Sequence, residues 1–441
     1  MIDESSWSFA VAAARRGPPT SDLRGTVRLL FGIILHLLPL SVRSWSLPCW
    51  SGHHRQGLPK LSMSSWEGQP KHVVIAGAGV IGLSTSYYLA ENHGISSTVV
   101  DPTGRVAPAA SGKAGGFLAL DWNDMSPVGQ LARRSFQLHQ ELADTLGAKV
   151  IQYRRLTCAA VSVNPSLGKR PSGKKVDGVE WAEDVVLGFR PLGDENTIAQ
   201  VHPKLLCENL WKVASKPKEQ GGVGSNLVRG RVVSLVCENG AVVGAKLMDG
   251  TTLQGDAVLF ACGPWDINVM TGVKYHSVVI PTPRVLSQSI FFSGLGDPEV
   301  YPRPDSTAYC TGFPDPAVKV TERPGEEEVR PEAVSRIVEA VRKASGGTDK
   351  RGTLSAAPSL EQACYLPTTP DGLPVMGRLP CNDRDSDQCF VAAGHTCWGI
   401  LLGPASGESM AHLIATGRST EHVDLRPYDP ARFSGIGLSK S

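Results

Sequence analysis

The apolar residues of this chain fall into short runs and periodic stretches that predict alternating strands and helices. Residues 73–76 (VVIA) form a continuous apolar run, which is typical of a strand buried on both faces of a parallel sheet. Residues 83–92 continue as a helix, and residues 97–100 form a second apolar strand. This part of the chain therefore predicts a strand–helix–strand unit with a glycine-rich turn after the first strand.

That turn reads GAGVIG and has the spacing of a dinucleotide-binding loop. Gly77 permits a tight turn, Gly79 lets a pyrophosphate approach the backbone, and Gly82 lets the helix pack closely on the strand. The positive end of the helix dipole then faces the phosphates. Asp101 follows the second strand and can accept hydrogen bonds from a ribose 2′-hydroxyl, which disfavours NADP. The alternative is an ordinary turn that binds no ligand.

The middle of the chain predicts further helices and strands. An amphipathic helix is expected within residues 127–147, and a helix that begins at a proline is expected within 201–216. Residues 228–266 predict three strands, because the dipeptides Asn239-Gly240 and Asp249-Gly250 are strong hairpin signals.

Small residues are concentrated in two other stretches. Residues 111–116 (SGKAGG) either let the backbone lie flat against a planar ligand or are merely flexible. Residues 389–417 predict a strand, a Gly/His/Trp loop and a helix that opens near Pro404. The N-terminus of that helix, at residues 403–407, would suit the ring of a flavin, where negative charge develops on reduction. A helix N-terminus at the ring has no counterpart in nicotinamide binding, so this feature favours a flavin.

Composition and charge narrow the classes of function. The chain has 441 residues, which usually means two domains or subdomains. Its formal net charge of +2 does not indicate a nucleic-acid partner. The ten cysteines include no CxxC pair and no zinc-binding spacing with histidine. We therefore expect reduced thiols and no metal site.

Residues 1–69 are predicted to lie outside the fold as a targeting segment. No acidic residue occurs between Asp22 and Glu67, while arginine and serine are frequent, as in a chloroplast or mitochondrial transit peptide. The apolar run at 29–42 is shorter than the roughly twenty residues that a bilayer needs, so a membrane anchor or signal sequence is the second alternative. The third is translation from Met63, which would give a cytoplasmic protein.

Four motifs occur in the order seen in one known family. They read GAGVIG with Asp101, GRVVSL…DAVLFACGPW, CYLPTTPDGLPVMG and AAGHTCWGILLGPASGE. In these motifs the chain resembles the D-amino-acid oxidase superfamily of FAD-dependent oxidoreductases, and within it the branch of sarcosine oxidase and glycine oxidase. The resemblance extends from His72 to Arg418. It implies that the dinucleotide is FAD.

The resemblance also implies the fold. An α/β architecture is expected, with a Rossmann-type, discontinuous FAD-binding domain and an α+β substrate domain built on an antiparallel sheet. The FAD-binding domain would comprise residues 70–125, 196–270 and 364–425. The substrate domain would comprise residues 126–195 and 271–363, and a tail would follow at 426–441.

The family pattern implies the site residues by position. The pyrophosphate would lie on the GAGVIG turn, the adenosine ribose on Asp101, the adenine beside the backbone of Val232, and the flavin ring beside the loop after the last strand. The expected cofactor-binding residues are Gly77, Gly79, Val80, Ile81, Gly82, Asp101, Ser111, Gly112, Lys113, Val232, Gly263, Cys364, Gly394, His395, Gly399, Ile400 and Leu401.

The expected catalytic residues are Lys113, Tyr365 and His395. Tyr365 would form a pocket wall and offer a hydroxyl. His395 would either polarise the flavin or substrate, or fix the loop that carries it. Trp398 would line the pocket or only fill space.

The reaction of the family is oxidation of a C–N bond. The neutral amine transfers a hydride to flavin N5, water hydrolyses the imine, and the electrons pass to oxygen or another acceptor. The resemblance therefore implies an enzyme acting on a small amine or amino acid, such as sarcosine or an N-methyl amino acid, with no nucleic-acid partner and no firm membrane association. Two alternatives are a flavoprotein that acts as an assembly or trafficking factor and an NAD-dependent dehydrogenase.

Two positions bear on the substrate and the cofactor. Family members that oxidise amino acids often carry an arginine where this chain has Leu366. A substrate carboxylate would then need another cation, for which Arg284, Lys274 and Arg303 are candidates. Cys364 matches a cysteine that sarcosine oxidase links covalently to its flavin. We expect non-covalent FAD here, with a link at Cys364 as the alternative.

Overall fold

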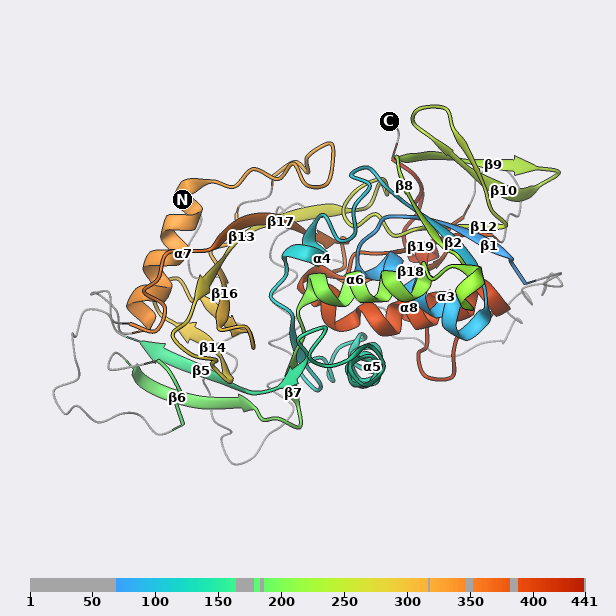
Figure 1. Ribbon diagram of the computed structural model, residues 1–441. Coiled ribbons are helices and arrows are strands. Elements are labelled where there is room, and N and C mark those ends of the chain that lie inside the picture. Colours follow the sequence, from blue (N-terminus) through green and yellow to red (C-terminus); the bar gives the residue numbers. More distant parts are fainter. Residues whose placement is uncertain are drawn as a thin grey trace, which may run out of the picture.

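The computed structural model describes residues 69–163, 178–182, 186–315, 318–345, 352–380 and 388–439. They form two joined halves, one built on a six-stranded sheet and the other on a seven-stranded sheet (Figure 1). The targeting segment predicted at residues 1–69 lies outside the described residues except for Gln69. No helix within the described ranges is long and apolar enough to cross a membrane.

The six-stranded sheet has the order β18-β19-β12-β1-β2-β8. All neighbouring pairs are parallel except β18 and β19, which are antiparallel. The strands come from three separate parts of the chain, as expected for a discontinuous nucleotide-binding domain. They are β1 (His72–Ala76), β2 (Ser96–Asp101), β8 (Asn226–Arg229), β12 (Ala257–Phe260), β18 (Val375–Arg378) and β19 (Cys389–Ala393).

Both faces of this sheet are covered, which explains why β1 is apolar throughout. Val73 and Ile75 belong to the core under the helices, whereas Val74 and Ala76 belong to the core on the opposite face. That opposite face is covered by a three-stranded sheet of β9 (Val232–Glu238), β10 (Ala241–Leu247) and β11 (Thr252–Gln254). The hairpin turns predicted at Asn239-Gly240 and Asp249-Gly250 join these strands.

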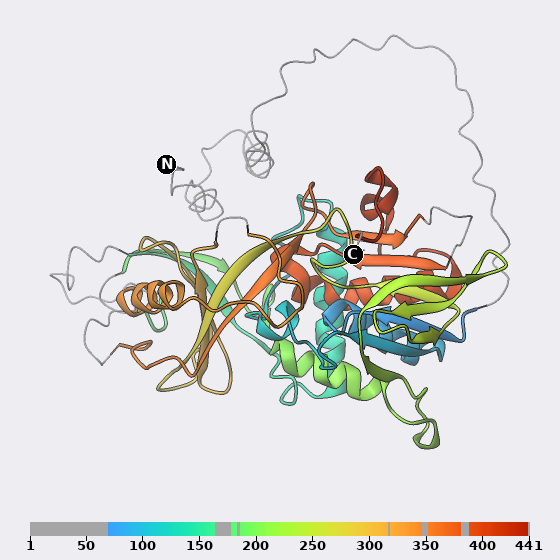
Figure 2. The ribbon, with the colours of Figure 1, turned by 90° about the horizontal axis from the view of Figure 1, so that it is seen from above.

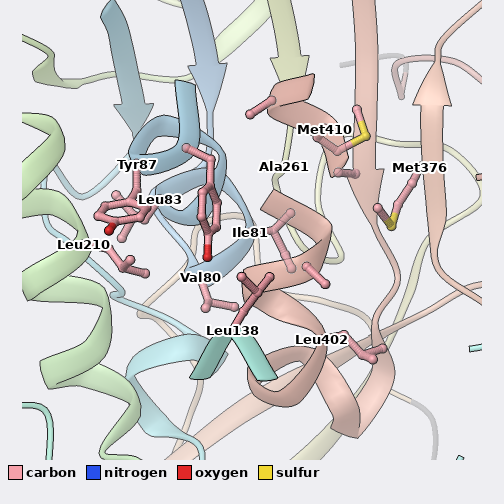
Figure 3. Packing of buried hydrophobic residues seen from close by; sticks show 14 of the residues in the cluster. Val80, Ile81, Leu83, Tyr87, Leu138, Leu210, Ala261, Met376, Leu402 and Met410 are labelled. Carbon is pink, nitrogen blue, oxygen red and sulfur yellow. The ribbon is translucent and has the colours of Figure 1, made fainter. Parts of the chain in front are cut away.

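The helical face is built on α3 (Val80–His93), which packs between α6 (Pro203–Ala214) and α8 (Gly399–Thr416). Figure 3 shows their side chains interleaving, with Leu83 of α3, Leu210 of α6 and Met410 of α8 in one cluster. The contact between α3 and α8 is very close. A Cβ atom at Gly407 would lie 2.3 Å from Ser84 Cβ, so only glycine fits at this position.

The last helix begins earlier than the sequence predicts. We expected it to open near Pro404, but α8 begins at Gly399 and Pro404 lies inside it. Residues 403–407 are therefore buried within the helix instead of forming its N-terminus. Proline inside a helix lacks the amide that would bond to the carbonyl four residues earlier, here Ile400, and such a helix normally breaks.

The amphipathic helix α5 (Gly129–Leu146) supplies the groups that Pro404 cannot. The Nε2 atom of His139 lies 2.9 Å from the Ile400 carbonyl oxygen, and the Ala405 amide donates to Ser135 Oγ at 3.0 Å. Ser135 and His139 are fully buried and four residues apart, so they lie on the same face of α5. The helix therefore continues through its proline because a neighbouring helix forms hydrogen bonds with both the Ile400 carbonyl and the Ala405 amide.

The seven-stranded sheet has the order β17-β13-β16-β15-β14-β5-β6 and is antiparallel apart from the β14–β5 pair. One face packs on α7 (Pro331–Ala344), on the outer side of the molecule (Figure 2). The other face is turned toward the six-stranded half. The strands are β5 (Thr157–Val163), β6 (Val186–Gly193), β13 (Thr271–Pro281), β14 (Gln288–Ser293), β15 (Glu299–Pro302), β16 (Thr307–Gly312) and β17 (Leu360–Thr368).

Smaller elements connect the halves. A three-stranded sheet contains β3 (Phe117–Ala119), β7 (Ile198–Gln200) and β4 (Arg154–Arg155), and a short helix α4 spans Ala110–Lys113. The 3₁₀ helices are η3 (Lys218–Gln220), η4 (Thr396–Trp398), η5 (Arg426–Tyr428) and η6 (Pro430–Arg432).

The domain boundaries remain a prediction, but the placement of three segments bears on them. Helix α5 lies in the predicted substrate segment yet packs on α8 of the nucleotide-binding half. Strand β17 spans the predicted boundary between residues 363 and 364. The predicted tail at 426–441 pairs back through an isolated bridge between Leu438 and Ile267.

The hydrogen bonding from α5 that compensates for Pro404 can be tested with a double-mutant cycle. H139L leaves the buried Ile400 carbonyl without its donor, which should lower the free energy of unfolding by about 1–3 kcal/mol. P404A restores an amide to the helix, so H139L should cost much less in that background. Urea denaturation of the wild type, both single variants and the double variant measures the coupling. An equal cost of H139L in both backgrounds would contradict this explanation.

Candidate active site

A cavity of about 700 Å³ lies between the six-stranded sheet and the seven-stranded sheet. Its volume falls within the range of roughly 300–1,000 Å³ that small-molecule and cofactor sites occupy. One end meets the carboxyl ends of β1 and β2, where open α/β sheets bind their ligands. The other end is lined by the seven-stranded sheet, so one chamber connects the two halves.

The GAGVIG turn forms one end of the cavity. Gly77 has φ of +110°, and a Cβ atom there would lie 2.3 Å from the Ala261 carbonyl oxygen. A Cβ atom at Gly82 would lie 2.1 Å from the Gly77 carbonyl oxygen, which shows how closely α3 packs on the turn. Gly77 and Gly79 line the cavity, whereas Gly82 supports them from behind.

The N-terminus of α3 points into the same space. The amide of Val80 donates to Ser111 Oγ at 2.9 Å, so the small-residue stretch 111–116, which begins in α4, meets α3 here. Gly112 does not line the cavity, and a Cβ atom there would lie 2.1 Å from the Ala107 carbonyl oxygen. Backbone amides, a hydroxyl and the positive end of a helix dipole suit a pyrophosphate.

Asp101 is held at the end of β2 by a small hydrogen-bond network. Its Oδ1 accepts from the Thr103 amide at 2.9 Å and from the Thr103 hydroxyl at 2.6 Å. Its Oδ2 lies 3.3 Å from the Ala78 amide. Burial raises the pKa of Asp101, and the bonds from Thr103 oppose that shift. Thr103 fixes the carboxylate, a role that the motif alone did not predict.

The adenine end of the expected cofactor corresponds to two other predicted residues. Val232, at the start of β9, and Gly263, after β12, both line the cavity. Gly263 has φ of +62°, which permits the chain to turn back beside the sheet. Next to them, Arg231 and Asp266 form an ion pair at 2.6 Å.

The loop after β19 forms the middle of the cavity wall. The backbone of Gly394 turns with φ of +78°, and that of Thr396 follows with φ of +52°. His395 is buried, and its Nε2 lies 2.9 Å from Ser406 Oγ in α8. Burial lowers the pKa of His395 to about 3, so the imidazole is neutral at physiological pH. Gly399 and Ile400 complete this wall at the start of α8.

Strand β17 sends alternate side chains to the cavity. Cys364 and Leu366 line it, and Tyr365 between them is turned to the other face. The Tyr365 ring packs edge-on against Trp265, with centroids 6.2 Å apart. Burial raises the pKa of the Cys364 thiol to about 12.

Lys113 is likewise engaged away from the cavity. Its Nζ donates to Glu327 Oε2 at 2.6 Å and to the Ala363 carbonyl oxygen at 2.9 Å. The Glu327 side chain is fully buried. Through its bond to Ala363, Lys113 holds α4 against β17. Breaking its pair with Glu327 would leave an uncompensated charge on the buried carboxylate, which disfavours any other position of the lysine.

The cavity thus gathers most of the predicted cofactor residues. Those that line it are Gly77, Gly79, Val80, Ile81, Asp101, Ser111, Val232, Gly263, Cys364, Gly394, His395, Gly399 and Ile400. The predicted cofactor residues that do not line it are Gly82, Gly112, Lys113 and Leu401, and Tyr365, which was predicted to be catalytic, does not line it either. The catalytic roles assigned to Lys113, Tyr365 and His395 remain predictions.

The wall formed by the seven-stranded sheet is strongly aromatic. Tyr301 stacks on Tyr309 with ring centroids 5.8 Å apart, and on Phe117 at 5.3 Å. Trp122 and Trp398 meet edge to face at 6.4 Å and close another side. Trp398 therefore lines the pocket. The tyrosines were missed by the sequence analysis, although Tyr301 and Tyr309 each stand in an alternating strand pattern.

Charged groups in the cavity differ from those expected. Arg284 pairs with Glu180 at the surface, Lys274 is buried on the opposite face of β13, and Arg303 donates to the Ala114 carbonyl oxygen. None of the three lines the cavity. The charged residues that line its wall on the seven-stranded half include Arg190, Asp297 and Glu299, and the Asp297 carboxylate accepts a hydrogen bond from the Gly294 amide.

The residues of the nucleotide half fit FAD. The glycine turn admits a pyrophosphate, the α3 N-terminus faces it, and Asp101 can receive a ribose hydroxyl. The neutral His395 and the apolar wall near Cys364 suit a planar ring system. Within the described ranges, no group of three or more His, Cys, Asp or Glu side chains is arranged to hold a metal ion.

The neutral state of His395 predicts a pH dependence of stability. Its pKa of about 3 lies below the value of roughly 6.5 expected in the unfolded chain. Acidification therefore protonates the unfolded chain first, and the free energy of unfolding should fall by about 2 kcal/mol between pH 7 and pH 5 from this residue.

Urea denaturation at both pH values measures this loss. H395Q, which retains a partner for Ser406, should be less sensitive to acid by that amount. H422Q is the matched control, because the His422 side chain is half exposed. If H395Q and the wild type lose stability equally, the assignment of a neutral buried His395 is wrong.

The sequence and the fold both match known proteins. A family model described as FAD dependent oxidoreductase (DAO) matches residues 72–413. A putative oxidoreductase of Schizosaccharomyces pombe is 30% identical over 393 residues, which cover 80% of this chain and 97% of that protein. A glycine oxidase of Bacillus licheniformis is 26% identical, over 77% of this chain and 92% of that protein.

A solved glycine oxidase from Geobacillus kaustophilus has the same fold, with a TM-score of 0.65 at 20% identity, over 83% of this chain and 99% of that one. These matches confirm the expected α/β fold and the expected FAD dependence. The protein belongs to the DAO family of FAD-dependent oxidoreductases.

Proposed function

We propose that this protein oxidises a C–N bond of a small amine or amino acid. One observation carries the proposal: the cavity runs from the glycine turn to an aromatic wall that also carries charged residues, so a cofactor and a small substrate can share it. FAD, when bound, supplies the acceptor for a hydride, which carries the two electrons of the oxidation. Oxygen or another acceptor would then receive the electrons.

Several relatives support this class of substrate. Proteins named glycine oxidase recur among them, and one relative is named 4-methylaminobutanoate oxidase. A solved structure with the same fold is named iminodiacetate oxidase. All three names describe small molecules in which an amine and a carboxylate occur together.

The residues of the chain would bind, orient and exclude water. The glycine turn and Asp101 hold the dinucleotide, while the 394–400 loop and Cys364 lie beside the ring. Trp122 and Trp398 shield the reacting end from water, which strengthens every electrostatic contact inside. His395 can fix the loop through Ser406 without adding a charge.

We infer that FAD is held without a covalent bond. A thiol attacks as its thiolate, and burial raises the pKa of Cys364 to about 12. Lys113 lowers that pKa but is already paired with Glu327. Cys364 therefore serves as a small apolar wall beside the ring.

Only residues 1–69 bear on the location of the protein in the cell, and they lie outside the described residues except for Gln69. We propose import into a chloroplast or mitochondrion, on the basis of the long stretch without acidic residues.

Anaerobic absorbance of the FAD-loaded full chain tests the proposed reaction. Glycine, sarcosine, other N-methyl amino acids, proline, and D- and L-amino acids should be titrated one at a time. At least one of these compounds should bleach the flavin bands, and NADH should not. A flavin that no amine in the panel reduces would contradict the proposal.

Acid precipitation tests the mode of attachment. All flavin should appear in the supernatant from the wild type, because no bond to Cys364 has formed. C364S should release it in the same way and retain FAD in the native state. Yellow precipitate from the wild type, but not from C364S, would show a covalent link.

A further inference from the structure

One lateral row of side chains crosses the cavity face of the seven-stranded sheet. Thr311 pairs with Glu299, Glu299 with Phe291, Phe291 with Ala160, and Ala160 with Arg190. Residues directly opposite one another on neighbouring strands point to the same face. Accordingly, all five line the cavity.

Glu299 is an acid in an aromatic setting. The Tyr301 hydroxyl donates to its Oε2, and this is its only hydrogen bond within the described residues. Phe291 lies on the next strand, and its ring centroid is 5.7 Å from that of Tyr301. No lysine or arginine of the described chain forms an ion pair with Glu299. Burial raises its pKa, which means that the carboxylate gains much from a cation.

Arg190 occupies the other end of the row. Its Nη2 is buried and has no hydrogen-bond partner among the described residues. Its guanidinium pairs with no described carboxylate, and burial lowers its pKa. Three strand spacings separate Arg190 from Glu299, or about 14 Å between their Cα atoms.

Two opposite charges on one wall, each without an ionic partner, are costly in an apolar cavity. They are too far apart along the sheet to be direct neighbours, since Phe291 and Ala160 lie between them. A ligand with a cationic group at one end and an anionic group at the other would pair with both. The aromatic rings around Glu299 also favour a cation.

We propose that Glu299 binds the ammonium group of the substrate and accepts one proton from it, while Arg190 binds an anionic group of the same molecule. The ammonium N–H bond breaks, the proton forms an O–H bond on the Glu299 carboxylate, and the amine is left neutral. This inference rests on the proposed function, because amine oxidation requires a neutral nitrogen lone pair. The favoured substrate is then an amine that also carries a carboxylate.

Calorimetric titration of the FAD-loaded full chain with propylamine and, separately, with propionate tests the two ends. E299Q should weaken propylamine binding by about tenfold or more and leave propionate unchanged. R190M should do the reverse. E299D should recover part of the propylamine affinity, because it restores the charge.

Matched controls separate recognition from general damage. E361Q changes an exposed acid of the same sheet, and R284M removes a surface arginine, so both should bind the two probes as the wild type does. If E299Q binds propylamine as the wild type does, or if it weakens both probes equally while keeping its FAD, the proposal is overturned.

Binding of these probes needs no turnover. A protein that discriminates the probes as expected but whose flavin no amine reduces would refute the proposed function alone. Reduction of the flavin with no effect of E299Q or R190M on the probes would refute this inference alone.

Discussion

The cavity depends on how closely two helices pack at its edge. Helix α3 begins at Val80 and α8 begins at Gly399, and both first turns line the cavity. Their axes can approach only because Gly407 leaves no side chain against Ser84. Two helix N-termini therefore converge on one space, where their dipoles favour an anionic cofactor. The N-terminus of α8 reaches the cavity because this helix begins at Gly399, before its proline. That early start depends on the hydrogen bonds from Ser135 and His139 of α5.

In the proposed site, the two ends of the cavity would recognise their ligands by different means. The nucleotide end would use glycines, backbone amides and one carboxylate, whose positions are fixed by the fold itself. The substrate end would use side chains that project from one face of a sheet, while the opposite face packs on α7. A change of side chain on the cavity face leaves that packing intact. Substrate choice can therefore vary within a family whose cofactor site and fold remain the same.

Much of the nucleotide end could be predicted from the sequence, because its function requires glycine at fixed spacing. The helix start near Pro404 was wrong because a local rule for proline cannot know that α5 supplies the missing partners. The sequence placed Tyr365 in the pocket wall, but the register of β17 turns it away and presents Cys364 and Leu366. Alternation shows that Glu299 and Tyr301 share a face, but not which face meets the cavity. Arg190 becomes visible only when the pairing of four strands is known.

The central claim is that one chamber holds the cofactor and the substrate between the two sheets. A crystal structure of the full chain with FAD tests it most directly. We expect the flavin ring beside Cys364 and the 394–400 loop, the adenine near Val232, and open space between the ring and the row from Glu299 to Arg190. A flavin ring that fills the space against Glu299, or FAD bound outside this cavity, would contradict it.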